Sequence, residues 1–251
     1  MFNIKILFLL FLTYSFLGWV MEMIVTVIED KEVVNRGFLV GPYCPIYGVC
    51  SIAMILLLNK VTNPVLLFVL SIIICSVGEY LTSYILEKIF NARWWDYSNM
   101  KFNLNGRICL RNCFFFGLLG FLVLNYINNY FANIYLSLNP NTLNIIFYSL
   151  LTIFLVDLII SCNVLLKIKN MSLKYINLDN TKEISIKVKD ILTKNFLSRR
   201  LLKAFPYLME ATKKGFKKIK NRVRSKWFIC LKTKKYLFWE WQEVVIMRQK
   251  F

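Results

Sequence analysis

Five long runs of apolar residues constrain this chain more than any other feature of its sequence. The runs cover about residues 4–28, 38–58, 65–86, 112–136 and 143–166, and none of them contains more than two charged side chains. About 20 apolar residues are enough for a helix to cross the hydrocarbon core of a bilayer. We therefore predict an all-α fold, a polytopic membrane helix bundle with about five transmembrane helices.

The second run, residues 38–58, is the weakest of the five. Gly41-Pro42 and Pro45 interrupt its first third and leave only residues 46–58 unbroken. A spanning helix and a re-entrant helix are both open here. The first run, residues 4–28, is too long for the apolar core of a signal peptide and lacks a small-x-small cleavage site. We expect it to remain in the mature protein.

Positive charge is concentrated in the last third of the chain. Residues 168–251 contain 22 of the 32 lysines and arginines. We therefore expect a transmembrane domain at residues 1–167 and a basic cytoplasmic tail with amphipathic helices at residues 168–251. The clearest amphipathic pattern covers residues 196–231, and helices of this kind lie on anionic membrane surfaces. Anionic lipid is the expected partner of the tail, because the sequence contains no nucleic-acid-binding motif.

The loops between the apolar runs alternate in basic content. In chain order the four loops contain two, one, five and no Lys or Arg residues. Because loops rich in Lys and Arg stay in the cytoplasm, five spans would place the N-terminus outside and the tail inside. The sequence thus predicts a multi-pass protein of the cytoplasmic membrane with a cytoplasmic C-terminus.

Three acidic residues lie inside the apolar runs. Glu22, Glu79 and Asp157 precede the ends of their runs by six, seven and nine residues, which places them about 9–14 Å below the cytoplasmic face. An acid in a membrane is costly and usually pairs with a cation or faces water. Salt bridges that lock the helices are one interpretation, and a polar cavity that binds a substrate or ion from the cytoplasm is the one we favour. Three basic residues near the cytoplasmic ends of the spans are candidate members of this polar layer: Arg36, Arg107 and Arg111.

Small residues and two irregular loops surround this layer. Gly18 shares a helix face with Glu22, and Gly117 and Gly120 form a smooth face that favours close helix packing. The glycines and prolines near Gly41 require an irregular backbone at membrane depth, which must be covered by protein or water. Asp96 is expected to pair locally with Arg93. Six polar, aromatic or small residues of the two loops form a candidate loop motif: Asn35, Gly37, Cys44, Trp95, Asp96 and Asn103.

Histidine is absent, and the seven cysteines include no CxxC pair. These facts exclude histidine-based catalysis and the usual zinc sites. Isolated cysteines in apolar runs usually pack as small apolar residues. We therefore expect no metal, no cofactor and no disulfide.

Four blocks of residues, taken together, resemble one known family. They are SFLGWVME at 15–22, NRGFLVGPYCPIYG at 35–48, WWDYS at 94–98 and GRICL at 106–110. Over about residues 10–125 the sequence is similar to the CmpB-like bacterial membrane proteins described as "putative ABC-transporter type IV". The resemblance implies a permease-like protein of the bacterial inner membrane. It implies no catalytic residues.

Three functions remain open on the sequence alone. The first is the membrane subunit of an ABC-type transport system, with a separate ATPase subunit because the sequence has no Walker A motif; a homo-oligomer is a further open arrangement. The second is a membrane-embedded enzyme acting on lipid headgroups, with Glu22 and Glu79 as acid and base and nearby arginines holding phosphate. The third is a lipid-sensing scaffold. The sequence favours a non-enzymatic function.

Overall fold

The computed structural model describes residues 3–31, 35, 37–90, 93–174 and 196–204. These residues are mainly helical, which confirms the predicted all-α membrane bundle. The elements in chain order are α1 (Ile4–Asp30), α2 (Pro45–Leu58), α3 (Pro64–Phe90), β1 (Asn103–Leu104), β2 (Ile108–Cys109), α4 (Leu110–Leu122), the π-helical segment η1 (Val123–Ile127), α5 (Asn128–Leu136), α6 (Pro140–Lys174) and α8 (Phe196–Ala204).

Four helical segments within the described part of the chain are long and apolar enough to cross a membrane. They are residues 4–28 in α1, α3, the continuous stretch from α4 through α5, and residues 140–167 in α6. Helix α2 has only 14 residues, a length of about 21 Å. Residues 38–44, the first third of the second apolar run, form an irregular loop, and Pro45 begins the helix.

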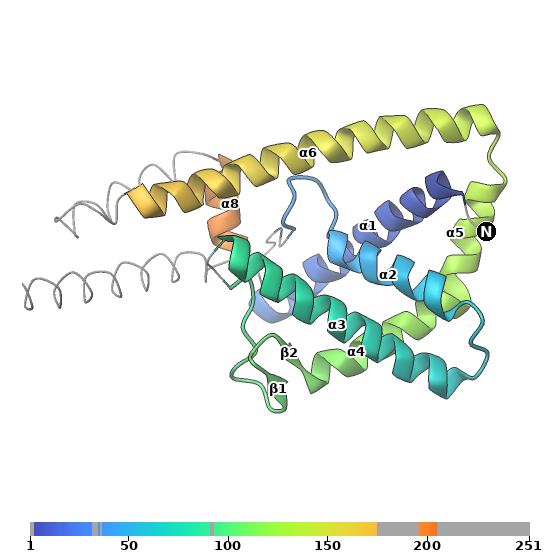
Figure 1. Ribbon diagram of the computed structural model, residues 1–251, viewed down its shortest axis with the longest axis horizontal. Coiled ribbons are helices and arrows are strands. Elements are labelled where there is room, and N and C mark those ends of the chain that lie inside the picture. The colour runs from blue at the N-terminus through green and yellow to red at the C-terminus, as the bar shows by residue number, and fades with distance from the viewer. Residues whose placement is uncertain (1–2, 32–34, 36, 91–92, 175–195, 205–251) are drawn as a thin grey trace, which may run out of the picture. The chain divides into compact units, whose positions relative to one another are not determined.

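The helices alternate in direction (Figure 1). Helices α1, α3 and α6 run toward one end, and α2 and the α4–α5 stretch run back from it. We call that end the basic end, since it carries two loops with Lys31, Arg93 and Arg107. We call the connection at residues 31–44 the first loop, of which the structure describes residues 31, 35 and 37–44, and the connection before α4 the second loop, described at residues 93–109.

Glycines set how closely the helices pack. A side chain at Gly48 of α2 would collide with Ser15 and Phe11 of α1, and one at Gly117 of α4 would collide with Phe68 of α3. Gly120 likewise faces Ser71 of α3. The predicted smooth face of α4 is thus the surface on which α3 lies, as expected for helices that approach closely in a membrane.

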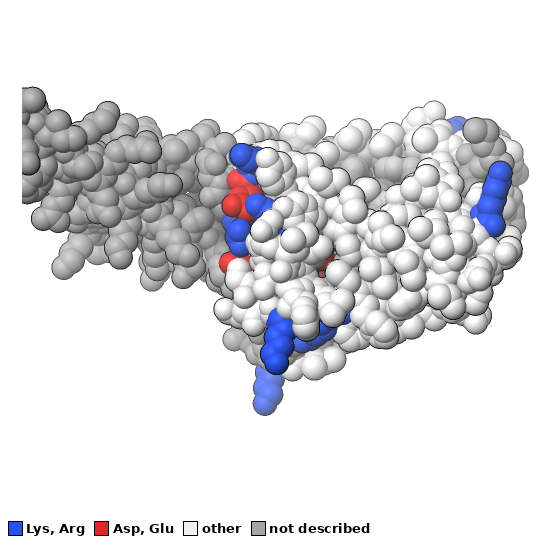
Figure 2. Space-filling model, turned by 60° about the horizontal axis from the view of Figure 1, so that its bottom comes forward, with Lys and Arg blue, Asp and Glu red and all other residues white. Residues whose placement is uncertain are grey.

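The outward faces of the spanning helices are apolar. Ile73, Val77 and Ile145 are 51%, 52% and 68% exposed, an arrangement that suits contact with lipid. Figure 2 shows a broad uncharged surface, with most Lys, Arg, Asp and Glu side chains near the end that carries the two loops. Together with the four helices of spanning length, this surface identifies a multi-pass membrane protein.

The second loop is held by its own residues. Strands β1 and β2 pair antiparallel, and the turn between them uses Gly106 with a φ of 68°, a conformation that favours glycine. The side-chain oxygen of Asn103 accepts the Gly106 N–H at 3.0 Å, and the indole of Trp95 donates to the Arg107 carbonyl at 2.9 Å. The neighbouring indole of Trp94 is 4% exposed, so the loop packs tightly against the bundle.

Candidate functional site: two acids at the basic end

The first loop reaches the middle of the bundle, where Asp157 of α6 binds its backbone. The Cys44 N–H donates to the carbonyl of Ser15, half-way along α1, at 2.9 Å. The carboxylate of Asp157 accepts the N–H groups of Val40 at 2.9 Å and Gly41 at 2.7 Å. The hydroxyls of Tyr43 and Ser161 also donate to this carboxylate, at 2.5 Å and 2.9 Å. Asp157 therefore satisfies donors that an irregular backbone at this depth leaves open.

Arg200 of α8 covers the carbonyl side of the same loop. Its guanidinium donates to the carbonyls of Leu39 at 2.8 Å, Val40 at 3.3 Å and Gly37 at 3.4 Å. Burial lowers the pKa of Arg200, and the negative charge of Asp157 opposes that shift. The first loop is thus held between an acid from α6 on its N–H side and a base from the tail on its carbonyl side.

Glu22 of α1 is bound by a tyrosine from α2. The hydroxyl of Tyr47 donates to Glu22 Oε1 at 2.5 Å. The Tyr47 ring lies against Gly18, where any larger residue would collide with it. Because Gly18 and Glu22 are four residues apart on α1, the ring crosses one helical turn and brings its hydroxyl to the carboxylate.

Glu79 of α3 has a much poorer set of partners. The side chain is 6% exposed, and the hydroxyl of Tyr97 in the second loop donates to its Oε1 at 3.2 Å. Its Oε2 is buried and has no hydrogen-bond partner among the described residues. Buried polar atoms without partners are uncommon in proteins and call for an explanation.

Tyr97 donates to Glu79 and also feels the charge of Glu22. Burial is the main cause that raises the pKa of the Tyr97 hydroxyl, and the charges of Glu79 and then Glu22 raise it further. The two acids therefore act on the same hydroxyl from two different helices. We call the group formed by Glu22, Tyr47, Glu79 and Tyr97 the two-acid cluster.

Two of the three arginines of the predicted polar layer, Arg107 and Arg111, lie elsewhere. Arg107 forms an ion pair with Glu87 at 2.8 Å, and Glu87 lies about two helical turns after Glu79 on α3. Arg111 is an exposed residue in the first turn of α4, and Arg36 lies outside the described residues. Of the six residues proposed for the layer, the structure brings Glu22 and Glu79 together and gives Asp157 a separate place against the first loop.

Most residues of the candidate loop motif support the loops themselves. Asn35 accepts the Trp19 indole N–H at 2.9 Å and the Gly37 N–H at 2.8 Å. Asp96 pairs with Arg93 at 3.3 Å, which confirms the predicted local pair. Cys44 immediately precedes α2 and is buried. As described above, Trp95 and Asn103 brace the second loop.

Four residues of these arrangements were not among the predicted site residues: Tyr43, Tyr47, Tyr97 and Arg200. Tyr43 and Tyr97 lie in the two loops and Tyr47 lies in the first turn of α2, and tyrosines at such positions suit packing at a membrane interface as well as binding of an acid. Arg200 is one of many basic residues in the tail, so its position in the sequence gives no signal. Only the folded chain separates it from its neighbours.

Residues 175–195 and 205–251 of the predicted basic tail, with Cys230 among them, lie outside the described residues. The other six cysteines are free thiols, and Cys44, Cys50, Cys75 and Cys109 are buried. This agrees with the expectation that the cysteines pack as small apolar residues. In α8 a hydrophobic residue, Leu201, is 2% exposed, so one face of this short helix packs onto the bundle.

Comparison with known proteins gives one match. The family described as "Putative ABC-transporter type IV" matches residues 9–162, which include both loops and the three acids Glu22, Glu79 and Asp157. No functionally curated protein and no solved structure matches the sequence. The ABC-transporter description of the family suggests a separate ATPase as partner. Because the match covers more than half of the chain, the protein belongs to the "Putative ABC-transporter type IV" family.

Proposed function

We propose that this protein is the membrane subunit of an ABC-type transport system in the bacterial cytoplasmic membrane. In this proposal the basic end faces the cytoplasm, and the two-acid cluster lines a polar cavity that is open to that side. Family membership supports the transport function. The concentration of Lys and Arg in the first loop, the second loop and the tail supports the orientation.

The observation that carries the proposal is the state of Glu79. Its carboxylate is almost fully buried, yet one oxygen lacks a hydrogen-bond partner among the described residues. A buried acid in a membrane segment costs about 2.5–3.5 kcal/mol on insertion scales and usually belongs to a substrate or ion pathway. A substrate with a hydrogen-bond donor or a positive charge would supply the missing partner.

ATP hydrolysis in this proposal belongs to a separate chain. The sequence contains no Walker A motif, whose glycine-rich loop and lysine hold the phosphates of ATP. The partner ATPase would dock on cytoplasmic loops, and the two loops at the basic end are the surfaces that the proposal offers to it.

The test uses the tagged full chain, purified from its native host with any bound ATPase and placed in liposomes. We expect an ATPase to co-purify. We also expect Glu79→Gln to keep that ATPase bound while it lowers transport-coupled ATP hydrolysis at least tenfold. Ser76→Ala is the matched control, because Ser76 is on the same helix and donates to Cys113 of α4 rather than to the cluster.

Two results would count against the proposal. A chain that purifies without any ATPase removes the transport-subunit role. A Glu79→Gln complex that hydrolyses ATP like the Ser76→Ala complex keeps that role and removes Glu79 from the pathway.

A further inference from the structure

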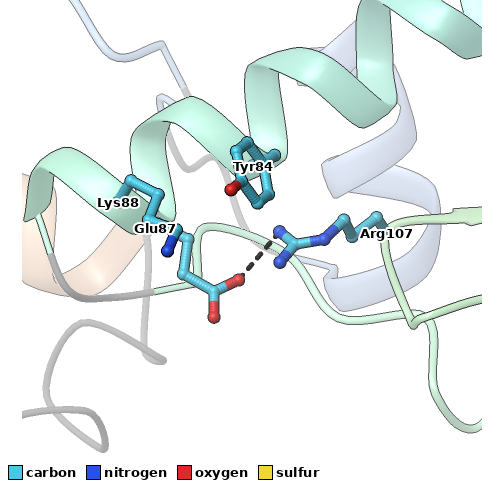
Figure 3. Close-up of a pocket in the computed structure, with 4 residues that line it drawn as sticks. All are labelled: Tyr84, Glu87, Lys88 and Arg107. Atoms are coloured by element: carbon cyan, nitrogen blue, oxygen red, sulfur yellow. Dashed lines mark ion pairs between the residues drawn. The ribbon is translucent and has the colours of Figure 1, made fainter.

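A second polar site lies at the basic end, separate from the two-acid cluster. It is a pocket of 260 Å³ lined by Tyr84, Glu87 and Lys88 of α3 and by Arg107 of the second loop. Figure 3 shows these four side chains pointing toward one another, with the Arg107–Glu87 ion pair at the centre.

Arg107 is held firmly in this pocket. It is 9% exposed. Its Nη1 lies 2.8 Å from Glu87 Oε2 and 3.3 Å from the Ser83 hydroxyl. Its guanidinium also lies 5.4 Å from the ring centroid of Tyr84 and 5.6 Å from that of Tyr80. Its Nε is buried and lacks a hydrogen-bond partner among the described residues. A guanidinium has five N–H donors in a fixed plane, a geometry that matches phosphate oxygens.

The charges around the pocket favour an anion. Glu87 is shared, because Arg93 Nε lies 3.3 Å from the carboxylate oxygen that binds Arg107. Arg93 in turn pairs with Asp96 at 3.3 Å. Lys88 adds a further cation, with its Nζ 5.5 Å from the Tyr84 ring centroid. Three cations thus face two carboxylates, which leaves one positive charge in excess.

The position of the pocket points to the source of the anion. Tyr84, Glu87 and Lys88 occupy the last two turns of α3, a helix of spanning length. The tryptophans of the second loop follow directly in the chain, and aromatic side chains of this kind gather at the level of lipid headgroups. A phospholipid in the adjoining leaflet would have its phosphate at this level.

We propose that this pocket binds the phosphate group of an anionic phospholipid. The lipid phosphate accepts hydrogen bonds from the Arg107 guanidinium and lies close to the Lys88 ammonium. Glu87 keeps Arg107 in position and does not contact the lipid. The proposal is independent of the transport function, because the pocket shares no residue with the two-acid cluster.

The test is a thermal-unfolding titration of the full chain in a neutral detergent with dihexanoyl phosphatidylglycerol. Dihexanoyl phosphatidylcholine and inorganic phosphate are titrated in parallel. We expect the phosphatidylglycerol to raise the unfolding midpoint at lower concentration than either of the other two. In Lys88→Gln the apparent affinity falls about fivefold, as expected for one basic residue near a phosphate.

Lys101→Gln is the matched control, because it removes the same charge from the second loop outside the pocket. The basic tail attracts anionic lipid equally in both variants, so a difference in affinity between them comes from the pocket. Arg107→Gln is a second pocket variant, but Arg107 is buried. Lys88→Gln is the main variant, because Lys88 is exposed and its substitution leaves the packing of the loop unchanged. Equal affinities in Lys88→Gln and Lys101→Gln would overturn the proposal, as would an equal response to phosphatidylcholine. A response to inorganic phosphate at the same concentration would show that the ligand is a free phosphate and overturn the lipid assignment.

Discussion

Asp157 and Glu79 are two buried acids with opposite surroundings. They are 8% and 6% exposed, so burial does not distinguish them. Asp157 accepts hydrogen bonds from two backbone N–H groups and two hydroxyls, whereas Glu79 accepts one long bond from Tyr97. A hydrogen bond to a charged group contributes about 1.5–3 kcal/mol. The comparison assigns Asp157 to the stability of the fold, and it is the reason why the proposed transport pathway centres on Glu79.

The same comparison separates the two loops. The first loop depends on residues that are distant in the sequence, because Asp157 and Arg200 hold its two sides. The second loop uses its own Asn103, Asp96 and Gly106. The second loop also contacts α3 through Tyr97 and Arg107. A change at Asp157 or Arg200 should therefore disturb the first loop and leave the second intact.

The largest expected effect is that of Asp157→Asn. The amide keeps one acceptor oxygen but turns an NH₂ group toward donors of the first loop, so we expect a loss of about 3 kcal/mol. The thermal-unfolding midpoint of the full chain in detergent should fall by about 6–12 °C. Thr152→Val on the same helix is the control, since Thr152 donates only to the carbonyl of Tyr148 one turn earlier. Equal midpoints for the two variants would contradict the structural role of Asp157.

Arg200→Gln should have a smaller effect on the same loop. It removes a half-buried guanidinium that donates to three carbonyls, and we expect a loss of about 1–2 kcal/mol. Hydrogen exchange should become faster in residues 37–43 and stay unchanged in residues 93–109. Together with Asp157→Asn the loss should be less than additive, because both side chains hold one loop. Unchanged exchange at residues 37–43 would show that α8 does not hold the loop.

A pair of Tyr→Phe changes sharpens the comparison between the two acids. Tyr43→Phe removes a 2.5 Å hydrogen bond to Asp157, and we expect a loss of about 1.5–3 kcal/mol. Tyr97→Phe removes a 3.2 Å bond to Glu79, and the loss should stay below about 1 kcal/mol. Each variant is the control for the other in thermal unfolding. A larger loss for Tyr97→Phe than for Tyr43→Phe would show that Glu79, and not Asp157, is the acid that stabilises the fold.

The sequence was sufficient to predict the helical membrane bundle and the family. Both follow from local patterns: long apolar runs for α1, α3, α4–α5 and α6, and short blocks of residues such as GRICL at 106–110 for the resemblance. The breaks at Gly41-Pro42 and Pro45 also indicated an irregular loop at membrane depth. Residues 38–44 form this loop, and Pro45 starts helix α2.

The partners of the buried acids could not be predicted in the same way. The position of an acid inside an apolar run indicates that it lies in the membrane, but its partner depends on which helices pack together. Arg107 was expected near the acids and pairs with Glu87 instead, while the donors to Glu22 and Glu79 are tyrosines. Arg200 reaches the first loop from outside the family match. These contacts are long-range, and hydropathy contains no information about them.

The most direct measurement compares the thermal unfolding of Glu79→Gln with that of the unchanged chain in the same detergent. Glutamine keeps the shape of the side chain and still accepts from Tyr97, but it removes a buried carboxyl group that has one unpartnered oxygen. We expect the midpoint to stay the same or to rise. A fall as large as that expected for Asp157→Asn would show that Glu79 is a paired part of the fold, and the reason for centring the transport pathway on it would be gone.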